Sequence, residues 1–186
     1  MFVRHGQATH NVTHAYCDEK ERDAALTSEG VRQAWDLRVD RLGERADVIY
    51  CSPLQRCRQT LALLLGDSGA RVLLDDRLME PQGSAIVNRR AEWDDLKAAV
   101  PPGWDLERVG LTNPYDQWVE GGTVGEDGHA HFDARVRAWT EEMCRGTPGK
   151  RVLVVTHHDW IASWFRQFGG RRVSVGNGQV IEGTLG

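Results

Sequence analysis

Three short polar segments carry side chains that together could bind and transfer a phosphoryl group. The segments are "RHGQATHN" at 4–11, "CSPLQR" at 51–56 and "THHD" at 156–159. Arg4 and Arg56 offer planar guanidinium donors suited to phosphate oxygens. Asn11, together with amides at the start of a helix, could add neutral donors. These residue types predict a local site for an anion.

Two imidazoles could face the same anion. A neutral His5 or His157 is a competent nucleophile, and the other ring, held protonated by the phosphate, would stabilise charge on the transferring group. Phosphoryl transfer needs in-line positioning and charge compensation, and the leaving alcohol needs a proton. Glu80, in "RLMEP", is the best-placed acid. We expect burial or a nearby anion to raise the pKa of this carboxyl.

Each of these residues alone has an ordinary structural explanation, so the argument depends on the elements that position them. Continuous apolar runs predict buried strands at 1–3, 46–52, 70–75 and 150–158. Helical spacing predicts helices after Thr27, at 53–65, around 91–99, around 132–143 and around 160–168. The apolar face of the helix after Thr27 is expected at Val31, Ala34, Trp35, Val39 and Leu42. "VSVGNGQVIEG" predicts a closing hairpin around 176–178.

This alternation predicts an α/β fold, a mostly parallel central sheet with helices on both faces in three layers. Ligands bind at the carboxyl ends of strands in such sheets. The three polar segments follow three predicted strands, so we expect them to meet at one edge of the sheet.

Length and composition bound the remaining possibilities. The 186 residues predict one domain over 1–186, with an irregular lid or insertion at about 80–129. A net charge of -4 does not favour a nucleic-acid or anionic-membrane partner. The four cysteines show no zinc-site spacing, which favours reduced thiols and a cytoplasmic protein. No signal peptide and no apolar run of membrane-spanning length is expected.

Five segments, in order along the chain, resemble the motifs of one family. "RHGQATHN" resembles the RHG signature of the histidine phosphatase (phosphoglycerate mutase-like) superfamily, branch 1. The other segments that resemble this family are "LTSEGVRQA", "CSPLQRCRQT", "LME" and "VLVVTHH". The ordered set is far more specific than any one motif.

The resemblance implies a role for each matching residue. His5 would be phosphorylated, and Glu80 would protonate the leaving group and then activate water. The residues implied to bind the phosphate or line the site are Arg4, Asn11, Thr27, Arg56 and His157. The substrate would be a small phosphomonoester, and no metal or other cofactor is implied. His10 and His14 are interpreted as rim or structural residues.

Several alternatives stay open at this point. Asp159 also resembles the proton donor of the acid phosphatase branch. A phosphomutase would use Arg89, Arg90 and Arg108 to hold a second phosphate, although the acidic residues of the same region favour hydrolysis. A non-catalytic protein that binds phosphorylated ligands is a third possibility.

Two further features of the sequence allow more than one interpretation. The first strand is short, either because it is brief or because the chain is truncated. Residues 104–129 either cover the site or form a solvent-facing loop anchored by tryptophans.

Overall fold

A single mixed sheet organises the part of the chain that the structure describes. The computed structural model describes residues 1–66, 70–81, 85–112 and 126–184, apart from the side chains of Val39 and of 126–129. The six strands lie in the order β4-β3-β2-β5-β1-β6. They are β1 (Phe2–Arg4), β2 (Val48–Cys51), β3 (Val72–Asp75), β4 (Asp105–Arg108), β5 (Val152–Thr156) and β6 (Val180–Ile181). Neighbouring strands are parallel except for β6, which runs antiparallel to β1.

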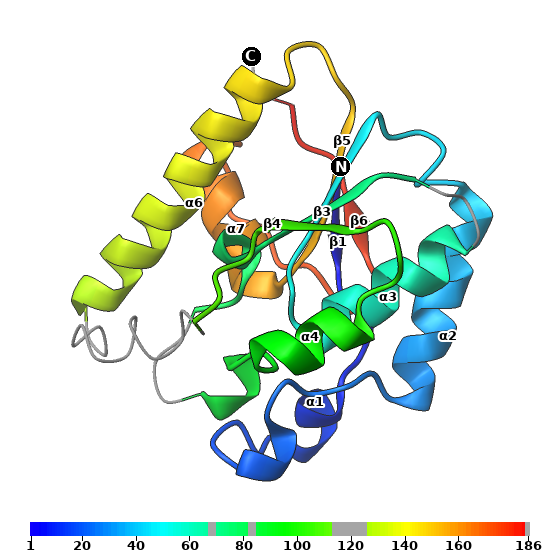
Figure 1. The fold of residues 1–186 in the computed structure, drawn as a ribbon. Helices are drawn as coiled ribbons and strands as arrows, with labels where there is room; N and C mark the ends of the chain where they lie inside the picture. The colour runs from blue at the N-terminus through cyan, green and yellow to red at the C-terminus, as the bar shows by residue number, and fades with distance from the viewer. Residues whose placement is uncertain (67–69, 82–84, 113–125, 185–186) are drawn as a thin grey trace.

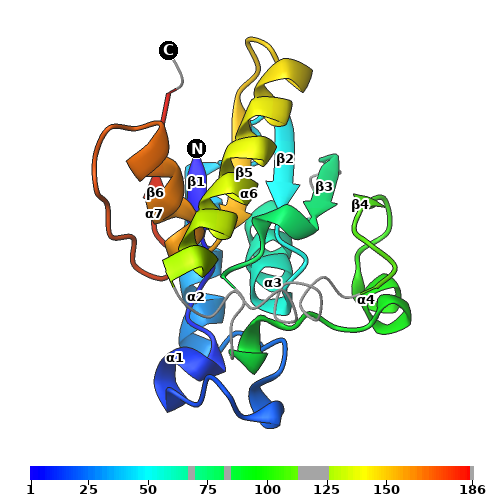
Figure 2. The same ribbon diagram turned by 90° about the vertical axis from the view of Figure 1, so that its left-hand side faces the viewer.

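Helices cover both faces of this sheet. The α-helices are α1 (Thr9–Thr13), α2 (Ser28–Asp36), α3 (Gln55–Leu65), α4 (Trp93–Ala99), α6 (Glu126–Gly146) and α7 (His158–Gln167). Short 3-10 helices are η1 (Glu19–Glu21), η2 (Leu37–Asp40), η3 (Asp76–Leu78) and η4 (Ile86–Asn88). In Figures 1 and 2, α6 and α7 lie on one face of the sheet and α2 and α3 on the other. The predicted three-layer α/β sandwich is confirmed.

Side chains of each central strand alternate between two separate cores. Val3 and Leu153 face the core that contains Leu61 of α3. Phe2 and Val154 face the opposite core, which contains the tryptophans of α6 and α7. This alternation is the ordinary period of a β-strand, and burial on both faces explains why these strands read as continuous apolar runs.

The predicted strands and helices are present with boundaries shifted by a few residues. Thr27 caps α2 as expected, because its Oγ1 accepts a hydrogen bond from the amide of Gly30 at 3.1 Å. Gly66 ends α3 with a φ of 53°. Helix α4 falls within the predicted 91–99 segment.

The predicted apolar face of the helix after Thr27 is wrong at two positions. Val31 and Trp35 are 43% and 54% exposed. Ala34 and Leu42 are buried as predicted, Gly30 is the other buried position of α2, and the side chain of Val39 lies outside the described residues. Helix α2 packs closely on α3 and on the loop after β1, so small residues occupy its inner face. The larger apolar residues at 31 and 35 therefore lie on the outer side.

The predicted closing hairpin is also wrong. Residues 173–175 form no strand, and β6 pairs with β1 instead, Val3 opposite Val180. Gly178, at a φ of 66°, reverses the chain. Its amide donates a shared hydrogen bond to the carbonyls of Arg4 and His5, with nitrogen–oxygen distances of 3.2 and 3.1 Å. The turn therefore closes against the loop after β1 rather than on its own preceding segment.

The sequence did not predict strand β4, which lies within the expected insertion. Its sequence "DLER" has none of the apolar character of the central strands. The strand occupies the edge of the sheet, where polar residues are tolerated. Trp104, just before it, packs against the core on the α3 side. None of the helices in the described ranges is long and apolar enough to cross a membrane.

Candidate active site

The carboxyl ends of β1, β5 and β2 bring the three polar segments together, as the sequence predicted. The amide of His5 donates to the carbonyl of Thr156 at 3.1 Å, which places the residues after β1 and β5 beside each other. The rings of His5 and His157 have centroids 5.2 Å apart. We call Arg4, His5, Arg56, Glu80 and His157 the strand-end cluster. In Figures 1 and 2 it belongs to the end of the sheet where α1 and α4 lie.

Two glycines allow the loop after β1 to sit against α2. A Cβ on Gly30 would come 2.0 Å from the carbonyl oxygen of Gln7, and a Cβ on Gly6 would come 2.5 Å from the carbonyl oxygen of Gly30. The two backbones are in direct contact, so neither position has room for a side chain. The amide of Gln7 donates to Oε1 of Gln33 at 2.9 Å, which ties the loop to the helix.

His5 is a buried, neutral ring with a defined tautomer. Its Nδ1 lies 2.7 Å from the carbonyl oxygen of Gly6. A carbonyl only accepts, so Nδ1 carries the proton. Nε2 is then unprotonated, and its lone pair accepts a hydrogen bond from Nε of Arg56 at 3.3 Å. Burial first, and then the charge of Arg56, hold the pKa of His5 well below its usual range.

His157 is completely buried at the N-cap of α7. Its Nε2 and the hydroxyl of Ser52 form a hydrogen bond of 2.9 Å. Burial, and then the charge of Arg56 and its neighbours, lower the pKa of His157 well below the ordinary value. The ring is therefore neutral here, and its protonation requires an anion at the site.

Arg56 is buried and Arg4 is partly buried, and neither guanidinium is paired with a carboxylate in the described part of the chain. Arg56 is 1% exposed, and its two terminal nitrogens donate to the carbonyl of Val87 at 2.9 Å and to Oδ1 of Asn88 at 2.7 Å. Arg4 donates to the carbonyl of Val175 at 2.8 Å. Among the described residues, neither forms an ion pair. Burial is the largest cause of the lowered pKa of each guanidinium.

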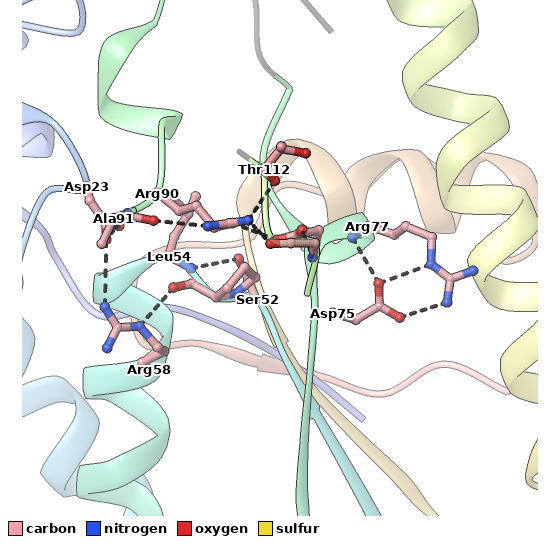
Figure 3. A network of polar contacts seen from close by, with 12 residues as sticks. Asp23, Ser52, Leu54, Arg58, Asp75, Arg77, Arg90, Ala91 and Thr112 are labelled. Atoms are coloured by element: carbon pink, nitrogen blue, oxygen red, sulfur yellow. Dashed lines mark hydrogen bonds and ion pairs between the residues drawn. The ribbon is translucent and has the colours of Figure 1, made fainter. Parts of the chain in front are cut away.

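Other buried arginines in the same protein do have partners. Arg58 and Arg90 each pair with a buried aspartate, at 3.7 and 3.0 Å. Figure 3 shows this network of polar contacts, which links α3 to the segment after η4. A buried charge without a counterion costs free energy. Arg4 and Arg56 differ from these arginines, because their guanidinium groups contact carbonyls, an amide oxygen and an imidazole rather than a carboxylate.

Glu80 is titratable near neutral pH. Its Oε1 accepts a hydrogen bond from the amide of Asp159 at 3.1 Å, at the start of α7. Burial, and then the negative charge of Asp159, raise the pKa of Glu80 to about 7, against the opposing effects of that hydrogen bond, Arg56 and Arg4. Burial and a nearby anion are the two causes that the sequence analysis named. A carboxyl with this pKa can donate and accept a proton at physiological pH.

The carboxylate of Asp159, the alternative proton donor, is in a different environment. Asp159 is exposed in the first turn of α7, whereas Glu80 is partly buried within the cluster. Of the two carboxyls, Glu80 is therefore the one held within the strand-end cluster, and the charge of Asp159 contributes to its raised pKa.

Asn11 and Thr27 are placed differently from the strand-end cluster. The Oδ1 of Asn11 accepts from the amide of Ala8 at 3.0 Å, and its Nδ2 faces His10 at 3.1 Å. The Thr27 hydroxyl is used by the cap of α2 and by Gln7, to whose Oε1 it donates at 2.8 Å. Asn11 lies in α1, directly after the loop that holds His5, whereas the hydroxyl of Thr27 is used in structural hydrogen bonds.

Two residues that the sequence analysis did not single out complete the surroundings of the cluster. Asn88 accepts from Arg56 and donates from Nδ2 to the carbonyl of Pro81 at 2.7 Å, so it connects the guanidinium to the residue after Glu80. Ser52 orients His157. Ser52 belongs to a quoted motif and could have been identified, whereas nothing in the sequence around Asn88 marks it.

Of the two interpretations of His10, as a rim residue or as a structural residue, its burial contradicts the first. His10 is 5% exposed, and its ring centroid lies 6.1 Å from that of His5. Burial, and then Arg56 and Arg4, lower the pKa of His10 to about 3. His14 is exposed, as expected for a residue at the rim.

Two of the three arginines proposed for a second phosphate are committed elsewhere. Arg90 is fully buried and donates to the carbonyls of Gly110 and Thr112 at 2.5 and 2.9 Å, the latter seen in Figure 3. Arg108 forms an ion pair with Glu142 at 2.5 Å. The remaining one, Arg89, lies 3.7 Å from a carboxylate oxygen of Glu92.

Part of the expected lid at about 80–129 lies outside the described residues. This includes 113–125, with the second tryptophan of the 104–129 segment. In the ranges that are described, no three His, Cys, Asp or Glu side chains gather in a way that could hold a metal ion.

Comparisons with known proteins agree on one family. The family model of the histidine phosphatase superfamily (branch 1) matches residues 1–178. A Hydrogenobacter thermophilus protein named as a phosphoserine phosphatase is 26% identical over 155 residues, 83% of this chain and 70% of that protein. The 2,3-bisphosphoglycerate-dependent phosphoglycerate mutase of Rhizobium rhizogenes is 28% identical over 173 residues, 88% of this chain and 75% of the relative.

A solved structure shows the same fold. A mutant phosphoserine phosphatase of Entamoeba histolytica, in complex with phosphoserine, superposes with a TM-score of 0.60 at 20% identity, covering 95% of this chain and 85% of that one. At this identity the likeness supports the fold of the sheet and its helices.

Proposed function

This chain belongs to the histidine phosphatase superfamily (branch 1), and we propose that it is a metal-independent phosphatase that hydrolyses a small phosphomonoester through phosphorylated His5. One observation carries the proposal: the neutral Nε2 of His5 faces the guanidinium of Arg56, which is buried without a carboxylate. A nucleophile in contact with a buried cationic side chain is what phosphoryl transfer to histidine requires.

In the first step, Arg4 and Arg56 hold the phosphoryl oxygens while Nε2 of His5 attacks phosphorus. The P–N bond forms as the bond to the alcohol oxygen breaks, and Glu80 gives that oxygen its proton. The Nδ1–H bond to the carbonyl of Gly6 keeps the ring in the tautomer that can attack. His157, beside His5, stabilises the charge of the transferring group.

In the second step, a water molecule attacks phosphorus and the P–N bond breaks. Glu80, now a carboxylate, accepts the proton of this water, and His5 returns to its neutral form as inorganic phosphate leaves. The pKa of Glu80 at about 7 suits a group that acts as acid and then as base.

Hydrolysis is favoured over phosphate transfer between two positions of a substrate. A mutase must grip a second phosphate, and Arg90 and Arg108 are occupied by ion pairs. The relatives named as phosphoserine phosphatase support a small phosphorylated substrate. Other relatives are named as phosphoglycerate mutases, so phosphomutase activity is the second candidate function.

The test measures hydrolysis of p-nitrophenyl phosphate in EDTA by the unmodified protein, His5→Ala and the control His131→Ala. His131 is exposed on α6. We expect turnover in EDTA, loss of more than about 1,000-fold in His5→Ala, and little change in the control. Acid-labile, base-stable phosphate on the quenched enzyme would identify the phosphohistidine. Full activity in His5→Ala would overturn the mechanism, and an inactive protein that binds phosphate would indicate the non-catalytic alternative.

A further inference from the structure

We propose that His10 is a third imidazole of the phosphate site and that its Nδ1–H donates a hydrogen bond to an oxygen of the bound phosphoryl group. This inference rests on the proposed function, because it adds a ligand-binding residue to that same site. No motif that led to the site assigns His10 this role.

The position of His10 is the first step of the argument. It lies in α1, and its ring is packed between His5 and Tyr16, with centroid distances of 6.1 and 5.8 Å. The exposed fraction of His10 is only 5%. The positive charges of Arg56 and Arg4 both lower its pKa. His10 therefore lies beside the nucleophile and within reach of both guanidinium groups.

A chain of hydrogen bonds assigns the tautomer of His10. Nδ2 of Asn177 donates to the carbonyls of His5 and Gly6 at 3.2 and 3.5 Å, and carbonyls only accept. The same amide nitrogen lies 3.3 Å from Oδ1 of Asn11, which also accepts from the amide of Ala8. The oxygen and nitrogen of Asn11 are therefore fixed by their neighbours.

The orientation of the Asn11 amide in turn determines the tautomer of His10. Nδ2 of Asn11 is a donor, so the His10 Nε2 that it faces at 3.1 Å must be the acceptor. A neutral imidazole carries one proton, which is then on Nδ1. Burial, Arg56 and Arg4 keep this ring neutral at physiological pH.

The Nδ1–H of His10 is buried without a partner among the described residues, and so is Nε of Arg4. Buried donors are nearly always satisfied, and one without a partner destabilises the fold. Both donors belong to the same eight-residue segment, "RHGQATHN", which also carries the nucleophile. An oxyanion at Nε2 of His5 would satisfy both, and it would interact favourably with the two uncompensated guanidinium groups.

Substitution of His10 tests this assignment through binding. His10→Phe keeps a ring between His5 and Tyr16 and removes the Nδ1 donor, but it also removes the Nε2 that accepts from Asn11. Loss of an unsatisfied donor and loss of that hydrogen bond oppose each other, so we expect the melting temperature without added oxyanion to change by no more than a few degrees. Affinity for orthovanadate, measured by calorimetry, should fall about tenfold. His10→Asn, whose Nδ2 can occupy the position of Nδ1, should recover part of that affinity, whereas His10→Gln should recover less.

The same titrations distinguish failure of this inference from failure of the proposed function. Equal vanadate affinity in the unmodified protein and in His10→Phe would overturn the role of His10, even if the enzyme is active. Equal recovery by Asn and Gln would also overturn the assigned Nδ1 donor. If the unmodified protein binds vanadate but does not hydrolyse phosphomonoesters, the proposed hydrolysis fails, and the binding comparison still decides the role of His10.

Discussion

The protonation states of Glu80, Arg4 and Arg56 depend on one another. The guanidinium groups oppose the rise in the pKa of Glu80, while burial and Asp159 cause it. A bound phosphate dianion would offset the positive charge and add a second anion near the carboxyl. We therefore expect Glu80 to be protonated most readily when substrate is present, which is when its proton is needed.

The first prediction concerns the pH dependence of Glu80. The protonated form donates, so kcat/KM for an alkyl phosphate should fall as pH rises through about 7. Glu80→Gln should lower kcat/KM for that substrate by about 100-fold or more and remove the alkaline fall. p-Nitrophenyl phosphate has a leaving group that is stable as an anion, so its kcat/KM should fall less in Glu80→Gln than that of the alkyl phosphate. Steady-state rates from pH 5 to 9 on both substrates measure this.

Asp159→Asn is the matched control for this prediction. Removing the negative charge at 159 lowers the pKa of Glu80, so the alkaline fall should move to lower pH and persist. If Asp159 were the donor, its substitution would abolish the fall and Glu80→Gln would retain it. That pattern would reverse the two assignments.

At the scale of elements, the contact between α2 and the loop after β1 explains why two distant motifs each contain a glycine. Gly6 and Gly30 let the backbones touch, and the ties of Gln7 to Gln33 and Thr27 hold them together. The position of His5 therefore depends on α2, although no side chain of α2 belongs to the strand-end cluster.

The second prediction tests this dependence with Gly30→Ala. The added Cβ would lie 2.0 Å from the carbonyl oxygen of Gln7, so the loop and α2 must separate. We expect the free energy of unfolding to fall by about 2–3 kcal/mol. A displacement of His5 by about 1 Å should also lower kcat/KM about 100-fold. Urea denaturation and p-nitrophenyl phosphate hydrolysis measure the two effects.

Gly146→Ala is the corresponding control. A Cβ at this last residue of α6 meets no described atom within 4 Å. The substitution should leave activity unchanged and raise stability by up to about 1 kcal/mol, because alanine favours the helix. Similar losses in both variants would show that the close contact of Gly30 has no special role.

The sequence predicted best those elements that are buried on both faces, because burial on both faces gives one recognisable residue pattern. The central strands are continuous apolar runs, and their order along the chain identified the edge that carries His5, Arg56 and His157. The exposure of Trp35 was not predictable, because an apolar residue at helical spacing looks like a core residue until the close packing of Gly30 is known. The closing segment failed for a similar reason, since Gly178 turns against β1, a partner distant in sequence.

The candidate site was predictable to the extent that its residues occur in ordered motifs. His5, Arg56, Glu80 and His157 could be found in that way. Asn88 could not, because its role depends on a carbonyl and a guanidinium that meet only in the fold. His10 lies inside a motif, but its importance comes from burial and from an unsatisfied nitrogen, which no spacing pattern reveals.

At the scale of the whole molecule, the positive charges at the end of the sheet have different partners from the buried arginines elsewhere in the described residues. Elsewhere, buried arginines such as Arg58 and Arg90 have aspartate partners. Arg4 and Arg56 are held by neutral groups of loops and of η4. Burial of a charge without a counterion is unfavourable, whereas the two aromatic and aliphatic cores on either side of the sheet contribute favourable burial of apolar surface.

The last prediction follows from this arrangement. An anion that binds only the folded protein raises stability by RT ln(1 + [L]/Kd), about 2.7 kcal/mol at one hundred times Kd. For a chain of this length, inorganic phosphate should raise the melting temperature by about 5–10 °C. Sodium chloride at equal ionic strength should have much less effect, because the site suits a multidentate oxyanion. Arg56→Gln should lose most of the phosphate-dependent shift. An equal shift with chloride, or an undiminished shift in the variant, would show that the phosphate acts elsewhere on the molecule.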